Sequence, residues 1–381
     1  MRVDARRCIE LLAGAAACGA LAYAAFALDR VRAFGRRAVP SAGAAQPPIS
    51  VLKPLRGSEP QLAENLRSFC RQDYADFEVI FGARDPDDAA LPIARDVARE
   101  FPGRARTVSG DGPRFVNPKI DTLGMMLPHA AHGVLVIADS DMRVEPDYLR
   151  AVIAPFGEPH VGAVTCLYRG TPLGGAVSTL AAMRADEHFA ASVLVAEALG
   201  PLRFCFGSTM AVRRTALEGV GGLAALGWHL ADDALLGELL SNAGWRVVLS
   251  PYVVENVVVE PTLWDLCLHE LRWARTNRML RPAGYALLFL TYPIPLAVLY
   301  AAVSRRPHAA AVLAAAFALR FALARAARRT FGVRGARAAW LVPVRDVLGL
   351  ALWAGAYATR DVRWRAERLT TAPDGRITSR A

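Results

Sequence analysis

The sequence lacks the short motifs that mark several common classes of protein. No Gly-x-Gly-x-x-Gly follows the first predicted strand and no Gly-x-x-x-x-Gly-Lys-Ser/Thr occurs in the 381 residues. The sequence therefore lacks the main evidence that would assign it to the dinucleotide oxidoreductases or to the P-loop enzymes. The six cysteines show no Cys-x-x-Cys spacing and lie in or beside apolar runs. This pattern predicts buried, reduced thiols and a soluble part that faces the cytoplasm.

Acidic residues are fewer than basic ones, 35 against 45, which gives a formal net charge of +10. No alternation of aromatic and basic residues and no nucleic-acid motif accompanies this charge, so no nucleic-acid partner is expected. Contact with anionic lipid headgroups explains it better, because much of the arginine flanks hydrophobic segments. The clearest examples are Arg325, Arg328, Arg329, Arg334 and Arg337.

Hydrophobic residues make up 54% of the chain, and the excess lies at its two ends. The run Cys8–Leu28 is long enough to span a bilayer, so we expect residues 1–30 to form a transmembrane anchor. A secretory signal is the main competitor, because arginines precede the run and Ala25–Ala27 resembles a cleavage site. Arginines before and after the run nearly balance, so the positive-inside rule does not orient it.

The C-terminal part, residues 281–381, is expected to hold membrane helices and a basic tail. Ala283–Val303 is a good spanning candidate, interrupted only by prolines, which membrane helices tolerate. Two further segments, 308–324 and 339–358, are weaker because they carry Arg320, Arg345 and Asp346. Charged side chains are costly in lipid unless they pair, so these segments are expected to span, re-enter or lie at the interface.

Residues 31–48 are expected to be a linker, rich in Ala, Gly, Ser and Pro towards its end, and residues 49–280 a catalytic domain. Strand and helix patterns alternate there, which predicts an α/β fold with a doubly wound, mostly parallel sheet. Strands are expected at 49–55, 78–83, 105–109 and 134–138, and helices at 61–70, 92–101 and 118–129.

Acidic residues follow the predicted strands. Asp139 and Asp141 come directly after the buried strand 134–138, where an i, i+2 pair can reach one Mg²⁺ or Mn²⁺ ion. The simpler interpretation is an acidic, solvated loop. Asp85, Asp87 and Asp88 follow the second strand but are equally good turn and helix-cap residues. A later pair, Asp232 and Asp233, opens a helix that runs to Ala243.

The order of these segments resembles the nucleotide-sugar glycosyltransferases of the GT-A fold, families 2 and 21. Among these it is most similar to the ceramide glucosyltransferases and to the hopanoid-biosynthesis glycosyltransferases. Residues 69–74 and 269–276 point to the hopanoid branch. The resemblance covers nearly the whole soluble domain and rests on Ser50–Gly57, Phe69–Tyr74, Asn117–Lys119, Ile137–Asp141, Cys205–Thr209, Ala231–Asp233 and His269–Thr276.

The resemblance implies a role for each motif. Asp139 and Asp141 would hold the divalent cation (Mg²⁺ or Mn²⁺) that bridges the diphosphate of a UDP-sugar. Asp233 would be the catalytic base of an inverting, single-displacement reaction. Because adjacent helical residues point about 100° apart, Asp232 is interpreted as a helix N-cap instead. The donor site would also include Pro54, Asp85, Asp87, Asp88 and Lys119, with Asp88 the best match at the uridine end.

The last motif of the family is usually (Gln/Arg)-x-x-Arg-Trp, and here it reads His269 to Trp273. The resemblance implies that Arg272 offers a forked donor to the diphosphate and that Trp273 stacks on the acceptor side. His269 departs from the usual residue, which makes its contribution sensitive to pH near neutrality. The spacing of apolar residues also predicts an amphipathic helix near residues 262–278 that lies at the membrane surface.

The expected function is therefore transfer of a sugar from a UDP-sugar to a lipid hydroxyl. For the hopanoid branch the resemblance implies N-acetylglucosamine as the sugar and bacteriohopanetetrol as the acceptor. The alternatives are a ceramide glucosyltransferase that uses UDP-glucose, a processive polysaccharide synthase, and a catalytically silent membrane scaffold. Nucleotide sugars are made in the cytoplasm, so a multi-pass protein of the cell inner membrane, with its catalytic domain facing the cytoplasm, is expected.

Overall fold

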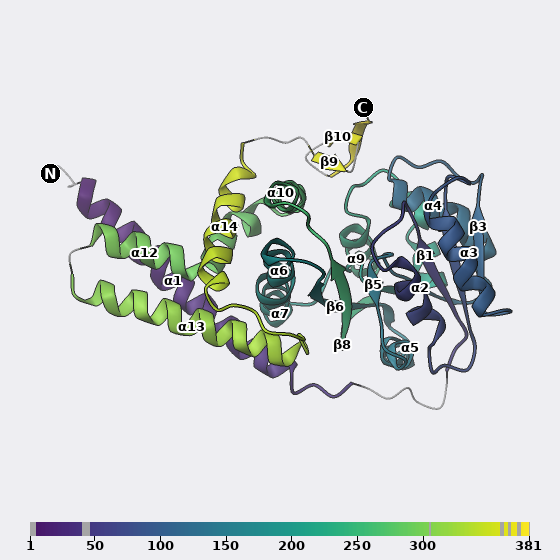
Figure 1. Cartoon of the computed structure of the whole chain (residues 1–381), viewed down its shortest axis with the longest axis horizontal. Helices are drawn as coiled ribbons and strands as arrows, with labels where there is room; N and C mark the ends of the chain where they lie inside the picture. Colours follow the sequence, from purple (N-terminus) through teal and green to yellow (C-terminus); the bar gives the residue numbers. More distant parts are fainter. Residues whose placement is uncertain are drawn as a thin grey trace.

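The structure, a computed structural model, describes residues 5–39, 46–304, 306–358, 362–364, 367–371 and 375–380. A domain built on a sheet lies at one end of the molecule and a bundle of long helices at the other (Figure 1). Part of the expected linker, residues 40–45, lies outside the described residues. The long helices are α1 (Ala5–Phe34), α12 (Pro293–Val303) and α13 (His308–Thr330).

The first half of the sheet domain follows the predicted alternation of strand and helix. Four parallel strands stand in the order β3-β2-β1-β4, and helices connect them. Strands β1, β2 and β4 are almost entirely buried, as expected where both faces of a parallel sheet are covered, whereas β3 at the edge of the sheet is partly exposed. These elements are β1 (Ile49–Pro54), α2 (Leu62–Cys70), β2 (Phe77–Ala83), α3 (Ala90–Glu100), β3 (Ala105–Ser109), α4 (Pro118–Met126) and β4 (Val134–Ile137).

The second half makes the sheet mixed rather than mostly parallel. The complete order is β3-β2-β1-β4-β7-β6-β8-β5, and β7 is antiparallel to both of its neighbours. Met210, at the start of β7, pairs with Ile137 at the end of β4, so the chain enters β7 from the carboxyl edge of the parallel strands. The remaining strands are β5 (Met142–Arg143), β6 (Val161–Pro172), β7 (Met210–Arg213) and β8 (Arg246–Val258).

Two apolar clusters cover the two faces of the sheet. One contains α2, α3 and α5 (Tyr148–Ile153). The other contains α4, α7 (Ala190–Leu199) and α9 (Asp232–Asn242), together with the ends of α1 and α13. Phe34 and Phe331 meet there with ring centroids 6.0 Å apart. Helices α1 and α13 therefore run in the same direction, and their C-terminal ends enter the core of the sheet domain.

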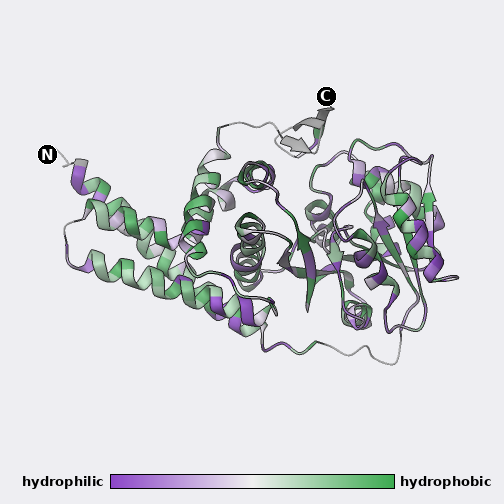
Figure 2. Ribbon diagram, in the orientation of Figure 1, coloured by the Kyte–Doolittle hydropathy of each residue, from purple (hydrophilic) through white to green (hydrophobic). Residues whose placement is uncertain are grey.

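Among the residues that the structure describes, two helices are long and apolar enough to cross a membrane, namely α1 over Arg6–Phe34 and α13 over His308–Thr330. The bundle they form is mostly hydrophobic along its length (Figure 2). The expected span Ala283–Val303 is instead broken, because Pro282–Thr291 and α12 meet at a bend of 71° and form a span only if counted together. Residues 308–324, which the sequence marked as the weaker spanning candidate, thus form a better candidate for a membrane span than residues 283–303.

The charged residues that weakened the C-terminal candidates are buried and paired. Arg320, on α13, is 0% exposed and donates to Asp346 of α14 (Leu341–Gly355) at 2.7 Å. A second bond, of 2.8 Å, runs from Arg320 to Glu187 of the π-helical turn η3 (Arg184–Phe189), which joins α6 (Ala176–Met183) to α7. These charged side chains therefore face the interior of the protein rather than lipid. Their charged partners there offset the cost of removing them from water.

Helix α10 (Leu263–Leu280) occupies the segment for which an interfacial helix was expected. Its N-cap is Thr262, whose side chain accepts the backbone N–H of Asp265. The apolar residues Leu263, Trp264 and Leu268 are exposed, Trp264 by 70%. The buried residues of the helix are Leu266 and Glu270. An exposed apolar stripe of this kind suits a helix that lies against a lipid surface.

Candidate active site

The carboxyl ends of β1 and β4 lie side by side, and the acidic turn after β4 is fixed by a buried lysine. Lys53 of β1 donates from Nζ to the backbone carbonyl of Asp139, and its ammonium lies 3.8 Å from the centroid of the Phe69 ring. Burial lowers the pKa of Lys53 to about 7, although Asp141 and Asp139 oppose that shift. The turn that carries both aspartates is therefore pinned to the neighbouring strand.

The carboxylate of Asp139 is paired with Lys119 of α4, from Oδ1 to Nζ at 2.6 Å. Burial alone would lower the pKa of Lys119, but Asp139, Asp232 and Asp233 together raise it above its usual value. The backbone N–H groups at the start of α4 are satisfied by the side chain of Asn117, which caps the helix. This cap fixes Lys119 at the edge of the sheet where the acidic residues gather.

The carboxylate of Asp141 is more deeply buried in the protein than that of Asp139. Its Oδ2 accepts a hydrogen bond of 2.8 Å from Asn256 Nδ2 on β8, whereas Oδ1 is buried and has no hydrogen-bond partner. Burial, and then the nearby charge of Asp139, raise the pKa of Asp141 to about 7. An unpaired carboxylate oxygen in this position is poised to accept a cation.

The pair at the start of α9 reaches the same edge. Asp232 is not the N-cap, since the cap residue is Ala231 and its side chain makes no cap bond. Asp232 instead accepts a bond of 3.2 Å from Asn117 Nδ2 and lies 3.7 Å from Lys119 Nζ. The N-cap interpretation of Asp232 was therefore wrong, because Asn117 and Lys119 recruit this carboxylate into the site.

Asp233 is held by backbone donors. Its Oδ2 accepts the N–H of Gly207 at 3.0 Å, and its Oδ1 accepts the N–H of Ala234 at 2.8 Å. Burial, and then the neighbouring charge of Asp232, raise the pKa of Asp233 to about 6. A carboxylate with such a pKa is ionised near neutrality and can accept a proton.

Gly207 connects Asp233 to the acidic turn after β4. Its carbonyl accepts the N–H of Asp139 at 3.1 Å, while its own N–H donates to Asp233. A Cβ at this position would collide with Asp139 Oδ2 and lie 3.1 Å from Lys119 Nζ. Glycine is therefore favoured here by the close approach of Asp139 and Lys119, and not by backbone conformation.

The first acidic motif makes bonds within its own loop. Asp88 accepts the N–H of Gly57 at 2.8 Å and that of Ala90 at 2.8 Å, so it ties the loop after β1 to the start of α3. Asp85 Oδ1 accepts the N–H of Asp87 at 2.9 Å. Asp88 thus fixes the loop that follows Pro54 at the carboxyl end of β1. Contact of the loop that carries Asp85, Asp87 and Asp88 with uridine stays a prediction.

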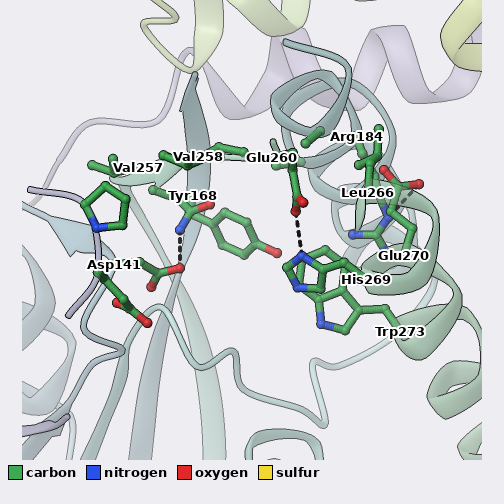
Figure 3. A pocket seen from close by; sticks show the side chains of 16 residues that line it. Asp141, Tyr168, Arg184, Val257, Val258, Glu260, Leu266, His269, Glu270 and Trp273 are labelled. Carbon is green, nitrogen blue, oxygen red and sulfur yellow. Dashed lines mark hydrogen bonds and ion pairs between the residues drawn. The ribbon is translucent and has the colours of Figure 1, made fainter. Parts of the chain in front are cut away.

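A cavity of about 180 Å³ lies between the end of β8 and α10. Asp141 lies on one side of it, and His269 and Trp273 on the other (Figure 3). The phenol of Tyr168, from β6, points across the space between them. The structure thus brings one predicted metal ligand together with the two predicted acceptor-side residues.

The α10 wall of the cavity is a set of stacked and paired side chains. His269 Nδ1 lies 2.8 Å from Glu260 Oε1, and the rings of His269 and Trp273 have centroids 4.3 Å apart. The guanidinium of Arg184 lies over the Trp273 ring at 4.3 Å. Arg272 lies at 5.6 Å from the same ring but does not line the cavity.

The donor set of this edge fits a divalent cation. Asp139 and Asp141 would supply hard oxygen ligands, and the buried Oδ1 of Asp141, which has no hydrogen-bond partner, would be free to bind the cation. In the part of the chain that the structure describes, no three His, Cys, Asp or Glu side chains gather around one point. The remaining ligands would therefore be substrate phosphate oxygens and water, as is common for Mg²⁺.

Sequence reasoning missed several residues that the geometry places in the site. Lys53, Gly207 and Asn256 hold the acidic residues, and Tyr168 and Arg184 line the cavity. Lys53 and Gly207 stand inside motifs that carried the resemblance but received no role. No motif in the neighbouring sequence identifies Tyr168, Arg184 or Asn256 as site residues, because only tertiary packing brings them to the cavity.

The mixed sheet, with acidic residues at the ends of β4 and at the start of α9, is the GT-A glycosyltransferase fold. The structure superposes on the mannosyltransferase PcManGT from Pyrobaculum calidifontis with a TM-score of 0.56 and 20% identity, covering 91% of this chain and 98% of that one. That protein was solved in complex with GDP-Man and Mn²⁺.

Within this fold, the profile of glycosyl transferase family 21 matches residues 12–377, and the chain belongs to that family. It is 24% identical to ceramide glucosyltransferase 1 of Caenorhabditis elegans over 238 residues, which are 62% of this chain and 51% of that protein. Ceramide glucosyltransferase 3 of the same organism is 23% identical over 245 residues, 62% of this chain and 52% of that protein. The chain thus spans about half the length of these curated relatives.

Proposed function

We propose that the protein is a membrane-bound, metal-dependent, inverting glycosyltransferase that moves a sugar from a UDP-sugar to a hydroxyl of a lipid. The observation that carries this proposal is the cavity in which Asp141 faces His269 and Trp273 of a helix with an exposed apolar stripe. Membership of family 21 supports the reaction class.

On the donor side, Asp139 and Asp141 would hold a divalent cation, which would act as a Lewis acid and offset the negative charge of the departing diphosphate. Lys119 adds a fixed positive charge at the same edge, 2.6 Å from Asp139. Arg272 offers two parallel N–H donors to phosphate oxygens. Pro54 and the loop of Asp85, Asp87 and Asp88 form the uridine side of the donor site.

On the acceptor side, Asp233 takes the proton of the lipid hydroxyl. The oxygen then forms a bond to the anomeric carbon as the bond to UDP breaks, which inverts that carbon in one displacement. The hydrogen bond from Gly207 orients the carboxylate. Trp273 and Tyr168 give the sugar or the acceptor headgroup flat apolar faces, and the pair of His269 and Glu260 gives it hydrogen-bonding groups.

Basic residues support a cytoplasmic orientation of the catalytic domain. The ends of α1 and α13 that meet at Phe34 and Phe331 lie beside that domain and are rich in arginine. By the positive-inside rule this end faces the cytoplasm, where nucleotide sugars are made. In a bacterium, the corresponding location is the inner membrane. The residues concerned are Arg30, Arg32, Arg36, Arg37, Arg325, Arg328, Arg329, Arg334 and Arg337.

For the substrates, we propose N-acetylglucosamine as the sugar and a hopanoid polyol, bacteriohopanetetrol, as the acceptor. The resemblance of residues 69–74 and 269–276 to the hopanoid branch supports this choice. The alternative is transfer of glucose to ceramide, which the names of the curated relatives favour. Either acceptor presents hydroxyl groups on an apolar anchor to a helix at the membrane surface.

The test is an assay of UDP release by the purified full-length protein with UDP-N-acetylglucosamine or UDP-glucose, Mn²⁺ or Mg²⁺, and each lipid. We expect release above the no-lipid background only with UDP-N-acetylglucosamine and the hopanoid polyol. Release with ceramide alone would replace the hopanoid assignment by the ceramide one. Absence of release with every pair would favour a catalytically silent scaffold.

A further inference from the structure

A buried ion pair joins α14 of the C-terminal helices to the α10 wall of the cavity. The guanidinium of Arg345 makes two parallel hydrogen bonds of 2.7 Å to the carboxylate of Glu270. Arg345 is 1% exposed and Glu270 4% exposed, and Arg345 also donates to the carbonyl of Leu180 on α6 at 3.3 Å. One guanidinium thus holds α10, α14 and α6 together.

Glu270 stands at the centre of the predicted acceptor motif. It follows His269 directly and lies three residues before Trp273, so the three side chains leave one turn of α10. Its carboxylate is 3.8 Å from Arg184 Nε, and Arg184 covers the Trp273 ring. Figure 3 shows Glu270 and Arg184 close together on the α10 side of the cavity, which both residues line.

Few other side chains anchor this part of α10. Its buried side chains are Leu266 and Glu270, and the stripe of Leu263, Trp264 and Leu268 is exposed. A paired guanidinium and carboxylate fix both distance and plane, whereas a single apolar contact lets a helix rotate. The Arg345–Glu270 pair therefore holds the rotation of α10 from the buried side of the helix, while the His269–Glu260 bond and the Arg184–Trp273 contact hold it from the cavity side.

We propose that Arg345 is a positioning residue for the acceptor pocket, acting through Glu270 to hold His269 and Trp273 towards Asp141. This inference rests on the proposed function. Arg345 touches no substrate, and its effect falls on the acceptor rather than on the donor. The donor groups Asp139, Asp141 and Lys119 belong to the sheet edge, which Arg345 does not contact.

Two conservative variants of the full-length protein in lipid nanodiscs test this. Arg345→Lys keeps the positive charge but loses the two parallel N–H donors of the guanidinium. Glu270→Gln keeps the shape of the side chain but loses its negative charge. We expect the acceptor KM to rise about tenfold to a hundredfold, the scale of effect of a small misplacement of positioning groups. The affinity for UDP with Mn²⁺, measured by titration calorimetry, is expected to stay at the wild-type value.

Arg320→Lys is the matched control, because Arg320 is equally buried but bonds to Glu187, His188 and Asp346 rather than to α10. It should lower thermal stability and leave the acceptor KM unchanged. The exchange of Arg345→Glu with Glu270→Arg should recover part of the acceptor KM. If the exchanged protein does not fold, Arg345→Lys decides alone, because Arg345 does not line the cavity whereas Glu270 does.

Three results overturn the inference: a wild-type acceptor KM in Arg345→Lys, a parallel loss of UDP binding, or the same rise of KM in the Arg320→Lys control. Failure of the proposed function looks different. In that case the wild-type protein itself transfers sugar to none of the lipids.

Discussion

Gly207 donates its backbone N–H to the carboxylate of Asp233 at 3.0 Å and accepts the N–H of Asp139 at 3.1 Å. The backbone of one residue therefore links the predicted base to the predicted metal turn. A side chain at this position would collide with Asp139 Oδ2 and crowd Lys119.

Gly207→Ala is expected to displace the Asp139 carboxylate, which is the flexible end of a partly exposed side chain, while the fold remains. Metal-dependent UDP binding should weaken by about tenfold, or about 1.4 kcal/mol. Titration of UDP with and without Mn²⁺ measures this, and thermal unfolding of the variant should match that of the wild type. Unchanged binding would mean that Asp139 has room to move aside.

Asp233→Asn should bind UDP normally and lose turnover, because the amide cannot accept the proton of the acceptor hydroxyl. General-base contributions are about a hundredfold to ten-thousandfold in rate. UDP titration and steady-state transfer to the lipid measure the two effects separately. Near-normal turnover in this variant would remove Asp233 from the role of base.

The pKa of Asp233 predicts how turnover depends on pH. Burial and Asp232 raise the pKa of Asp233 to about 6, and the base must be unprotonated. Turnover at saturating substrates should therefore be full above this pKa and fall as the pH drops through about 6. Asp233→Asn supplies the control, since its residual rate should lack this inflection. A wild-type profile that stays flat through this range would contradict the assignment.

Asp139→Ala should weaken donor binding in the presence of metal and leave Lys119 with a more distant partner, Asp232 at 3.7 Å. The loss should be larger with Mn²⁺ than with chelator present, because part of the affinity passes through the cation. Titration calorimetry with UDP under both conditions measures it. Equal affinities in the variant and the wild type would take Asp139 out of the metal site.

The sequence predicted the first half of the sheet well, because β1, β2 and β4 are buried apolar runs that end in turn or acidic residues, and the alternation with helices places the more exposed β3 between them. It did not predict that β7 runs antiparallel. That direction follows from where the chain re-enters after α7, and a four-residue strand carries no sign of its partner's direction.

The candidate site was predictable where one motif carries its own chemistry, as Asp139 and Asp141 do. Asp232 was misassigned because a helix-start aspartate is usually a cap, and its actual partner, Asn117, lies 115 residues earlier in the chain. The same limit applies to the C-terminal helices. Arg320 looked unfavourable for a span because its partners Glu187 and Asp346 come from two other helices.

Arg320→Met should destabilise the protein by about 3–5 kcal/mol, because Glu187 and Asp346 would remain buried without their shared cation. Adding Glu187→Met and Asp346→Leu should recover most of that loss, since apolar replacement of a whole buried network is often nearly neutral. Thermal unfolding in detergent, followed by intrinsic fluorescence, measures both variants. Arg329→Met, at an exposed position on the same helix, is the control and should leave the midpoint unchanged. A loss in the triple variant as large as in Arg320→Met would show that the network contributes beyond charge compensation.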